Sequence, residues 1–280
     1  MVEKLPIPDA ETIRKRRSVR TYEERPLSPE DRAKLVGYMG AVGNPFGVEV
    51  RLHIADRSVA AGGEKLGTYG IIKGAGTFLG VSVPDTEPAP LAAGYQFECL
   101  VLCAAPWASA RSGWRRPSTG RASPPPWASG PTSSSPPSAR GLPAARPRAA
   151  EALMRSAMKS AARRDWPELF FSGDLRAPLT RSAAGDYALP LEMLRLAPSA
   201  RNGQPWRVRL AGGAFHFYTA YNPGAAKGEA VIKHVDLGIG LSHFHQTALE
   251  LGLPGRFAVL PQDGIALPEE LHYAVSWLPA

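Results

Sequence analysis

The chain has 280 residues, enough for one large domain or two smaller ones with a sizeable core. It has no run of eighteen apolar residues and no apolar segment near its start, so we expect a cytoplasmic protein with no membrane association. The formal net charge is +8, but seven arginines and no acidic residue lie in residues 105–150, so the rest of the chain carries only 8 − 7 = +1. Because the charge belongs to this one segment, the composition argues against a nucleic-acid partner.

The chain before this segment has the pattern of mixed helices and strands. Residues 28–42 predict a helix, with Ser28 as N-cap, Pro29 at the first helical position and acidic residues in the first turn. Residues 44–56 pass from a turn into alternating apolar residues, and residues 67–83 contain glycine turns and a further apolar run. Each of these two stretches predicts a strand.

A long apolar run follows at residues 91–105. It is apolar on most faces, which is typical of a helix buried at the centre of a fold. Cys99 and Cys103 lie inside it, and we expect them to be small buried hydrophobic side chains, with no role in a disulfide or a metal site.

The chain after the arginine-rich segment repeats this order. Residues 187–197 predict a helix, residues 203–220 two strands joined by a Gly-Gly turn, and residues 234–253 a second long apolar helix. Final strands are expected at residues 256–261 and 271–278.

Two details support an internal duplication. Asn44-Pro45-Phe46 matches Gln204-Pro205-Trp206, each at the entrance of a strand, and Phe97 matches Phe244 within the apolar helices. We therefore predict two related lobes packed about a pseudo-twofold axis, residues 1–104 and 151–280, in an α+β fold with antiparallel or mixed sheets and long central helices.

The first candidate site is the basic run at residues 14–22, which contains Arg16, Arg17, Ser18 and Arg20. Guanidinium groups with a hydroxyl between them can bind a phosphate through charge-assisted hydrogen bonds. The alternative is a solvated basic turn, and the spacing alone does not exclude it.

The second candidate site is the turn at residues 196–208, which follows a helix and precedes a strand. Ser199 and Asn202 lie there, where side chains and backbone could face a planar polar ligand. Ordinary turn chemistry explains the same residues without a ligand. His243 and His245 are two apart on a helix and make a poor metal pair, so no metal site is expected.

Together and in this order, the two runs resemble the nitroreductase family of FMN-dependent oxidoreductases. The matching stretches are "RRSVRTY", "APSARNGQPWRV" and "HVDLGIGLSHFHQTALELGLPGRF", and "LGTYGIIKGAGTFLGV" resembles the branch of the family with two lobes fused in one chain.

This resemblance implies an FMN site between the lobes, with hydride passing from NAD(P)H through the flavin to a small organic acceptor and no catalytic side chain required. By position, Arg16, Arg17, Ser18 and Arg20 would hold the phosphate, and Ser199, Ala200 and Asn202 would border the flavin ring. Each motif is intact in only one half, so the resemblance implies one flavin site in a monomeric pseudo-dimer.

The resemblance stops after residue 104 and resumes near residue 151. The Pro-, Ser- and Arg-rich composition between them is typical of a disordered linker. However, the family has a strand and a helix here, and a linker would be inserted between elements instead of replacing them. We favour a frame error, in which this segment is translated in the wrong reading frame of its coding DNA. Trp codons and TCN Ser codons begin with T. When reading starts at the third base of the Pro106 codon, each such T becomes the middle base of a codon, and codons with a middle T encode apolar residues. The marked positions are Trp107, Ser109, Ser112, Trp114, Ser118, Ser123 and Trp127.

The segment leaves three hypotheses for the whole protein. The first is an active nitroreductase-like enzyme, and the second is an impaired remnant that binds flavin weakly or not at all. The third is a basic binding protein that uses the arginine-rich segment, which the location of the charge disfavours.

Overall fold

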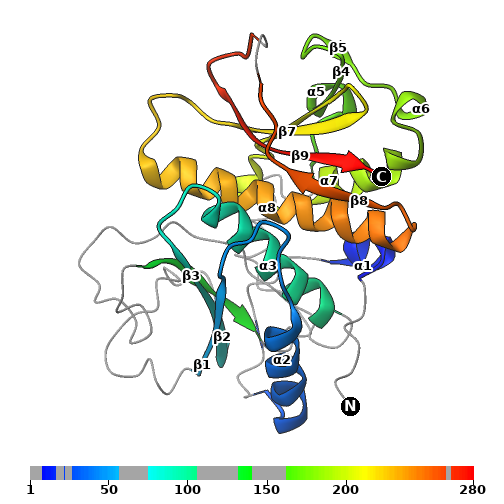
Figure 1. The fold of residues 1–280 in the computed structure, drawn as a ribbon. Helices are drawn as coiled ribbons and strands as arrows, with labels where there is room; N and C mark the ends of the chain where they lie inside the picture. The colour runs from blue at the N-terminus through cyan, green and yellow to red at the C-terminus, as the bar shows by residue number, and fades with distance from the viewer. Residues whose placement is uncertain are drawn as a thin grey trace.

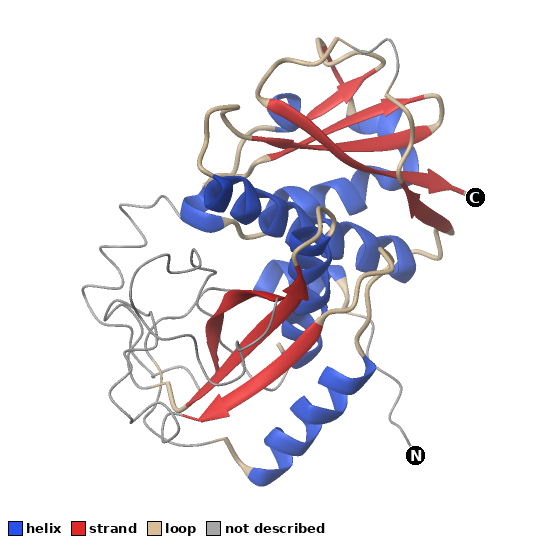
Figure 2. Ribbon diagram, turned by 60° about the vertical axis from the view of Figure 1, so that its left-hand side comes forward, coloured by secondary structure: helices blue, strands red, loops and turns tan. Residues whose placement is uncertain are grey.

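The computed structural model describes residues 8–16, 22, 27–56, 75–105, 132–140, 162–262 and 266–280, with 132–140 described by their backbone alone (Figure 1). Two helices, α3 (Ala89–Ala104) and α8 (Lys227–Glu250), lie between two sheets, as both ribbon views show (Figures 1 and 2). Nearly every residue of α3 and the middle of α8 are buried. The two apolar runs therefore form the central helices that the sequence predicts.

The two helices cross at backbone contact. A Cβ atom on Gly94 would lie closer than 3.0 Å to the carbonyl of Val235, and one on Gly238 equally close to the carbonyl of Leu91. Only glycine allows an approach of this kind, because any larger residue would force the helices apart.

These contacts are reciprocal along the two helices. Gly94 is related to Gly238, and Leu91 to Val235, by the same offset of 238 − 94 = 235 − 91 = 144 residues. The polar contacts of the crossing obey the same offset, since the Cys99–Ser242 and His243–Glu98 pairs give 243 − 99 = 242 − 98 = 144. This is the pattern that a pseudo-twofold axis produces. It differs from the Phe97–Phe244 match, whose offset is 147, so the sequence alignment of the two helices is wrong by three residues.

A six-stranded mixed sheet covers the α8 side, with strand order β5-β4-β6-β7-β9-β8. Its β4–β6 pair is parallel and its other pairs are antiparallel. The strands are β4 (Phe170–Ser172), β5 (Ala177–Pro178), β6 (Trp206–Ala211), β7 (Ala214–Ala220), β8 (Gly255–Ala258) and β9 (Leu271–Pro279). The short helices α5 (Trp166–Leu169), α6 (Arg181–Ala184), η2 (Gly185–Tyr187) and η3 (Ala200–Asn202) and the longer α7 (Ala188–Leu196) connect them.

Buried aromatic rings join this sheet to α8. Phe244 packs edge-on against Phe217 of β7 and Trp277 of β9, with ring centroids 5.3 and 5.7 Å apart. All three rings are almost fully buried, so each removes a large apolar area from water and fixes the sheet on the helix.

A three-stranded antiparallel sheet lies on the α3 side, in the order β1-β2-β3. The strands are β1 (Arg51–Asp56), β2 (Thr77–Pro84) and β3 (Thr132–Arg140). The first two were predicted, but β3 comes from the Pro- and Ser-rich segment. Its register on β2 shifts between Leu79 and Val81. An edge position tolerates proline, because the missing N–H can face away from the sheet. The rest of residues 105–150, where a linker or a frame error was predicted, lies outside the described residues apart from Ala105.

Two further helices belong to the first half, α1 (Ala10–Lys15) and α2 (Pro29–Ala41). The predicted N-cap of α2 is confirmed, because the Ser28 hydroxyl accepts a hydrogen bond from the Asp31 N–H at 3.0 Å. Helix α1 was not predicted from the sequence. Among the described helices, none is both long and apolar enough to cross a bilayer.

Candidate functional site

Helix α1 carries the first predicted site residue, Arg16, at its end. Asp9 caps the start of the helix by accepting the Thr12 N–H at 2.6 Å, and the Arg16 N–H bonds the Thr12 carbonyl at the other end. The apolar side chain of Ile13 packs in a small cluster with Leu102 of α3. The helix is therefore fixed against α3, and the chain beyond it begins from a defined place.

The side chain of Arg16 turns into the protein. It is only 7% exposed, and its Nε lies 3.8 Å from Oε1 of Glu98, whose side chain is fully buried. Of the four residues predicted to bind phosphate, only Arg16 is described, since Arg17, Ser18 and Arg20 lie outside the described residues. Their phosphate contact stays a prediction.

Glu98 also contacts His243 of α8. The same Oε1 lies 2.9 Å from Nε2 of His243, and the other ring nitrogen, Nδ1, lies 3.1 Å from the carbonyl of Met193. A carbonyl only accepts, so Nδ1 carries a hydrogen, and the Nε2–Oε1 contact needs a second proton on either the ring or the carboxyl group. Burial lowers the pKa of His243, and the hydrogen bond to Glu98 opposes this. The two groups therefore share one proton, and Arg16 lies beside this protonated pair.

The second candidate turn, residues 199–204, has an unusual backbone. Arg201, Asn202 and Gln204 have φ angles of +53°, +56° and +47°, a region that residues other than glycine rarely adopt. The surrounding structure holds this conformation, because the Ser199 hydroxyl accepts the Gln204 N–H at 2.9 Å and the buried Asp236 of α8 accepts the Ala200 N–H at 2.9 Å. Such strain is concentrated at functional sites in general, which supports a role for this turn.

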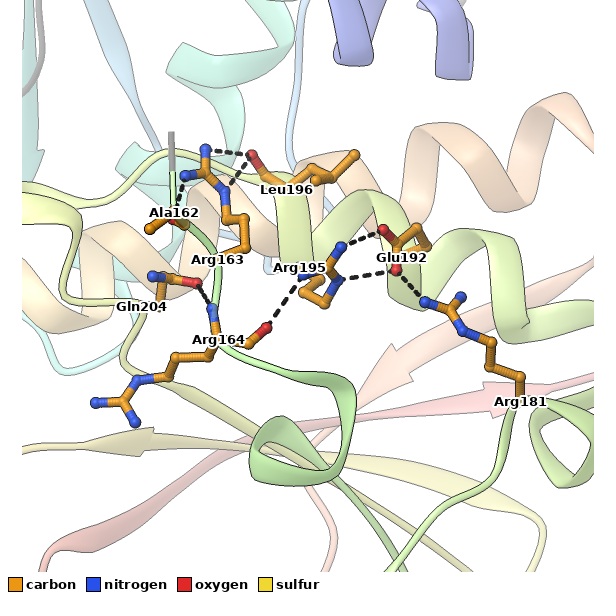
Figure 3. Close-up of polar contacts among 8 residues, drawn as sticks. All are labelled: Ala162, Arg163, Arg164, Arg181, Glu192, Arg195, Leu196 and Gln204. Atoms are coloured by element: carbon orange, nitrogen blue, oxygen red, sulfur yellow. Dashed lines mark hydrogen bonds and ion pairs between the residues drawn. The ribbon is translucent and has the colours of Figure 1, made fainter. Parts of the chain in front are cut away.

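The segment before α5 holds the same turn from the other side. Asn202 accepts a hydrogen bond from Arg163 at 3.2 Å and donates to the Ala162 carbonyl at 2.9 Å, while Gln204 accepts the Arg164 N–H at 2.8 Å. Figure 3 shows Gln204 beside Arg164, whose guanidinium points away from this network. The Asn202 side chain is thus fixed by residues 162–163 and cannot reorient freely.

Positive charge gathers around the turn. Arg163 donates a hydrogen bond to the Leu196 carbonyl, and Arg195 forms an ion pair with Glu192 at 2.6 Å (Figure 3). Burial and the nearby Arg164 lower the pKa of Arg207, which follows the turn on β6, to about 10. A ligand with an anionic or electron-rich edge would be favoured beside this turn.

Helix α8 brings the two candidate runs to one side of the molecule. The turn bonds Asp236, and the Arg16–Glu98 pair contacts His243, seven residues further along. Seven residues are nearly two turns, so these contacts lie on the same face of α8, roughly 10 Å apart along its axis. The turn that contains Ser199, Ala200 and Asn202 therefore bonds α8 directly through Ala200, and Arg16 is linked to the same helix face through Glu98 of α3.

Sequence reasoning missed the residues that position these runs, Glu98, Asp236, Arg163 and Arg164. A signal existed for the first two, because a charged residue in an apolar buried helix needs a partner. His243 and His245 were predicted to be structural, and they contact different groups, Glu98 and the Tyr95 hydroxyl. Among the described residues, no three His, Cys, Asp or Glu side chains are grouped as metal ligands.

The two cysteines are buried thiols outside any disulfide, and burial raises the pKa of Cys99 to about 12 and that of Cys103 to about 11. They are therefore uncharged and unreactive at neutral pH, as expected of small core side chains.

A solved structure shares this fold. The structure of a "putative nitroreductase" from Thermotoga maritima matches 99% of this chain and 96% of its own, with 17% identity and a TM-score of 0.61. A "putative NADH dehydrogenase/NAD(P)H nitroreductase" from Parabacteroides distasonis matches 49% of this chain and 89% of its own, with 18% identity and a TM-score of 0.35. No curated protein matches. The first similarity establishes the α+β nitroreductase fold.

A family model described as "Putative TM nitroreductase" matches residues 10–115 and 185–248, more than half of the chain. The two matched segments contain both candidate runs, all of α3 and α8 up to residue 248, and the unmatched interval contains most of the Pro- and Ser-rich segment. The chain thus belongs to this family of nitroreductases.

Proposed function

We propose that this protein is an FMN-dependent oxidoreductase that takes hydride from NAD(P)H and passes it to a small organic acceptor. The observation that carries the proposal is that two contacts made by the candidate runs lie on one face of α8, in a chain of the nitroreductase family: the Ser199–Gln204 turn bonds Asp236, and Glu98, the partner of Arg16, bonds His243. The proposal includes one site per chain and a monomer whose lobes take the place of two subunits, with no nucleic-acid partner.

The types of donor group in the two candidate runs suit a flavin mononucleotide. A phosphate needs cations and N–H donors, and the run that starts at Arg16 supplies guanidinium groups and a hydroxyl. The polar edge of a flavin ring needs fixed hydrogen-bonding groups, and the turn offers amide and hydroxyl groups that Asp236 and Arg163 hold in place. When bound, the flavin would supply the hydride chemistry, and the residues of this chain would bind it and orient it.

Asn202 tests the ring side of the site. Asn202→Gly removes the side chain and retains a residue suited to the positive φ, so the backbone of the turn is preserved. We expect about tenfold weaker FMN binding by fluorescence titration, equivalent to about 1.4 kcal/mol. Asn222→Gly is the matched control, because Asn222 lies in an exposed turn after β7 and bonds only locally, to the Gly224 N–H. Equal affinities for the two variants would contradict the assignment of the ring side.

The first experiment on the whole protein is purification followed by absorption spectroscopy and an NAD(P)H oxidation assay. A yellow protein with one FMN per chain that oxidises NADH or NADPH is the expected result. A comparison of the two dinucleotides then identifies the preferred donor.

A second candidate function is an impaired family member that binds flavin weakly. The observation that favours it is the gap in the family match between residues 115 and 185, which includes most of the Pro- and Ser-rich segment. A colourless protein, together with coding DNA whose second frame across residues 106–140 encodes an apolar, stop-free peptide, would support this candidate over the active enzyme.

A further inference from the structure

We infer that Lys233 of α8 supplies a cation to the proposed flavin site at the turn of residues 199–204, and that its ammonium stabilises the negative charge that a flavin ring gains on reduction. Lys233 was not among the site residues predicted from the sequence. Its role rests on the proposed function for the identity of the ligand, whereas the place of the ammonium rests on contacts of the described residues.

The ammonium of Lys233 lies against the turn at Gly203. A Cβ atom on Gly203 would lie 3.0 Å from Lys233 Nζ and 3.3 Å from the carbonyl oxygen of Ala200. Lys233 is half-buried, so its charge is partly shielded from water. Three residues further along α8, Asp236 accepts the Ala200 N–H at 2.9 Å. One stretch of α8 therefore holds the turn and places a cation beside it.

The glycine of this turn provides space and not an unusual backbone. Arg201, Asn202 and Gln204 have positive φ angles. Gly203, which lies among them, has φ −69° and ψ −24°, angles that any residue except proline adopts readily. A side chain at position 203 would push the ammonium away, so the glycine leaves this face of the turn open to Lys233.

No carboxylate is paired with Lys233 in the part of the chain that the structure describes. Lys227, six residues earlier on α8, pairs with Asp85 at 3.6 Å, but no ion pair joins Lys233 to a described acidic residue. A further cation lies at the same turn, since Arg163 donates to Asn202 at 3.2 Å. Positive charge that is held in place without a counter-ion favours a ligand that is, or becomes, negatively charged.

The related positions of the first half lack this arrangement. The 144-residue offset of the crossing relates Lys233 to residue 233 − 144 = 89, which is the fully buried Ala89 of α3. In the predicted duplication Gly43 takes the place of Gly203, and nothing lies within 4 Å of its Cβ position. Within the described residues this cation therefore belongs to the second turn alone, which agrees with the proposal of one flavin site per chain.

The chemistry of the flavin gives such a cation a specific effect. A hydride carries a proton and two electrons, so its transfer to a neutral flavin ring leaves the ring with a negative charge. A cation beside the ring stabilises this charged form more than the neutral one, because only the charged form gains the full Coulomb attraction. Lys233 is therefore expected to favour the binding of reduced FMN over oxidised FMN, which raises the reduction potential of the bound flavin.

Lys233→Met is the test variant, because methionine fills the space of the lysine stem without its charge. Anaerobic titrations with oxidised and with reduced FMN measure the two affinities, and the phosphate is common to both forms. We expect the affinity for reduced FMN to fall about tenfold relative to that for oxidised FMN, which lowers the two-electron reduction potential of the bound flavin by about 30 mV. Lys233→Arg keeps a cation and should restore most of the difference. The control is Lys227→Gln, which removes an exposed cation from the start of α8 and should change neither affinity.

Gly203→Ala moves the ammonium without removing it. The backbone angles at position 203 suit alanine, so this variant keeps the test available if Lys233→Met fails to fold. We expect the affinity for reduced FMN to fall about threefold relative to that for oxidised FMN. Gly43→Ala, its counterpart in the first half, should leave the ratio unchanged. A change in Lys233→Met without one in Gly203→Ala would overturn the inference, because the ammonium would then act from a place other than the turn.

The remaining outcomes separate the role of Lys233 from the proposed function. An unchanged ratio of the two affinities in Lys233→Met overturns the role of Lys233. An equal loss for oxidised and reduced FMN also overturns it, because the side chain would then be needed only for the structure of the site. In both cases a wild-type protein that binds FMN leaves the proposed function in place. A wild-type protein that binds neither form of FMN overturns both proposals.

Discussion

The two halves of the chain contribute equally to the central crossing but unequally to everything around it. At the crossing, Gly94 and Gly238 make the same close approach, and the polar pairs follow the same offset. Outside it, the second half carries six described strands and the first half two, with β3 drawn from the Pro- and Ser-rich segment. The comparison indicates that the helix–helix contact is the part of this fold that tolerates least change, because the two backbones leave no room for adjustment.

The polar contacts of the two central helices also differ between the halves. The Tyr95 hydroxyl bonds Nδ1 of His245 at 2.6 Å, while the offset relates these residues to Ile239 and Val101, which are both buried and aliphatic. Similarly, the charged Glu98–His243 pair is related to an uncharged one. The crossing is therefore symmetric in shape and asymmetric in polarity, and within the described residues a cation lies beside the Glu98–His243 pair and not beside the Cys99–Ser242 pair.

The largest expected effect comes from disrupting the symmetric glycine contacts at the crossing of α3 and α8. Gly94→Ala and Gly238→Ala each place a methyl group against a backbone carbonyl, and we expect each to reduce the free energy of unfolding by about 3 to 5 kcal/mol, measured by urea denaturation. Gly37→Ala in α2 is the control, because a Cβ there meets nothing within 4 Å, and it should stabilise the protein by up to about 1 kcal/mol. A tolerated Gly94→Ala beside a damaging Gly238→Ala would show that the approach of the helices is not reciprocal.

A smaller effect tests the asymmetric polar contacts of the crossing, through the pH dependence of the free energy of unfolding. Burial lowers the pKa of His245 to about 4, whereas an unfolded histidine titrates near 6.5. The unfolded chain binds the extra proton first, so the stabilisation is fully present above pH 6.5 and is lost as the pH falls towards 4. The loss amounts to about 3 kcal/mol.

The control for this effect is His245→Gln, which keeps an acceptor for the Tyr95 hydroxyl and has no titrating group. We expect the free energy of unfolding of this variant to vary less between pH 7 and pH 4 than that of the wild type. Parallel pH profiles for the two proteins would show that His245 does not titrate in this range on unfolding.

The sequence predicted the elements of this fold better than the contacts of its site. Local signals were sufficient for α2, where Ser28 and Pro29 mark the start, and for the Gly-Gly turn between β6 and β7. The pairing of Arg16 with Glu98 joins residues 82 apart, and no local pattern encodes it. The left-handed backbone of Arg201, Asn202 and Gln204 was equally hidden, because glycine is the usual signal for that conformation and these residues depend on Asp236 and Arg163 instead.

The smallest expected effect compares the two turns that the predicted duplication relates, one at Asn44 and one at Gln204. Asn44 donates to Gln96 at 2.8 Å and to the Val48 carbonyl at 2.9 Å, and it accepts the Phe46 N–H. Its counterpart Gln204 accepts the Arg164 N–H and donates to the Asn202 carbonyl. Both side chains thus hold a turn ahead of a strand, but only the second turn belongs to the candidate site.

We expect Asn44→Ala and Gln204→Asn each to lower the free energy of unfolding by about 1 to 2 kcal/mol, since each loses hydrogen bonds of a polar group, half-buried at Asn44 and buried at Gln204. Asparagine is chosen at position 204 because it tolerates a positive φ but is too short to keep both bonds. Their effects on FMN should differ, with binding weakened about tenfold by Gln204→Asn and unchanged by Asn44→Ala in a fluorescence titration. If Asn44→Ala weakened FMN binding as much, the first turn would also border a flavin, and the chain would have kept both of the sites that a twofold axis creates.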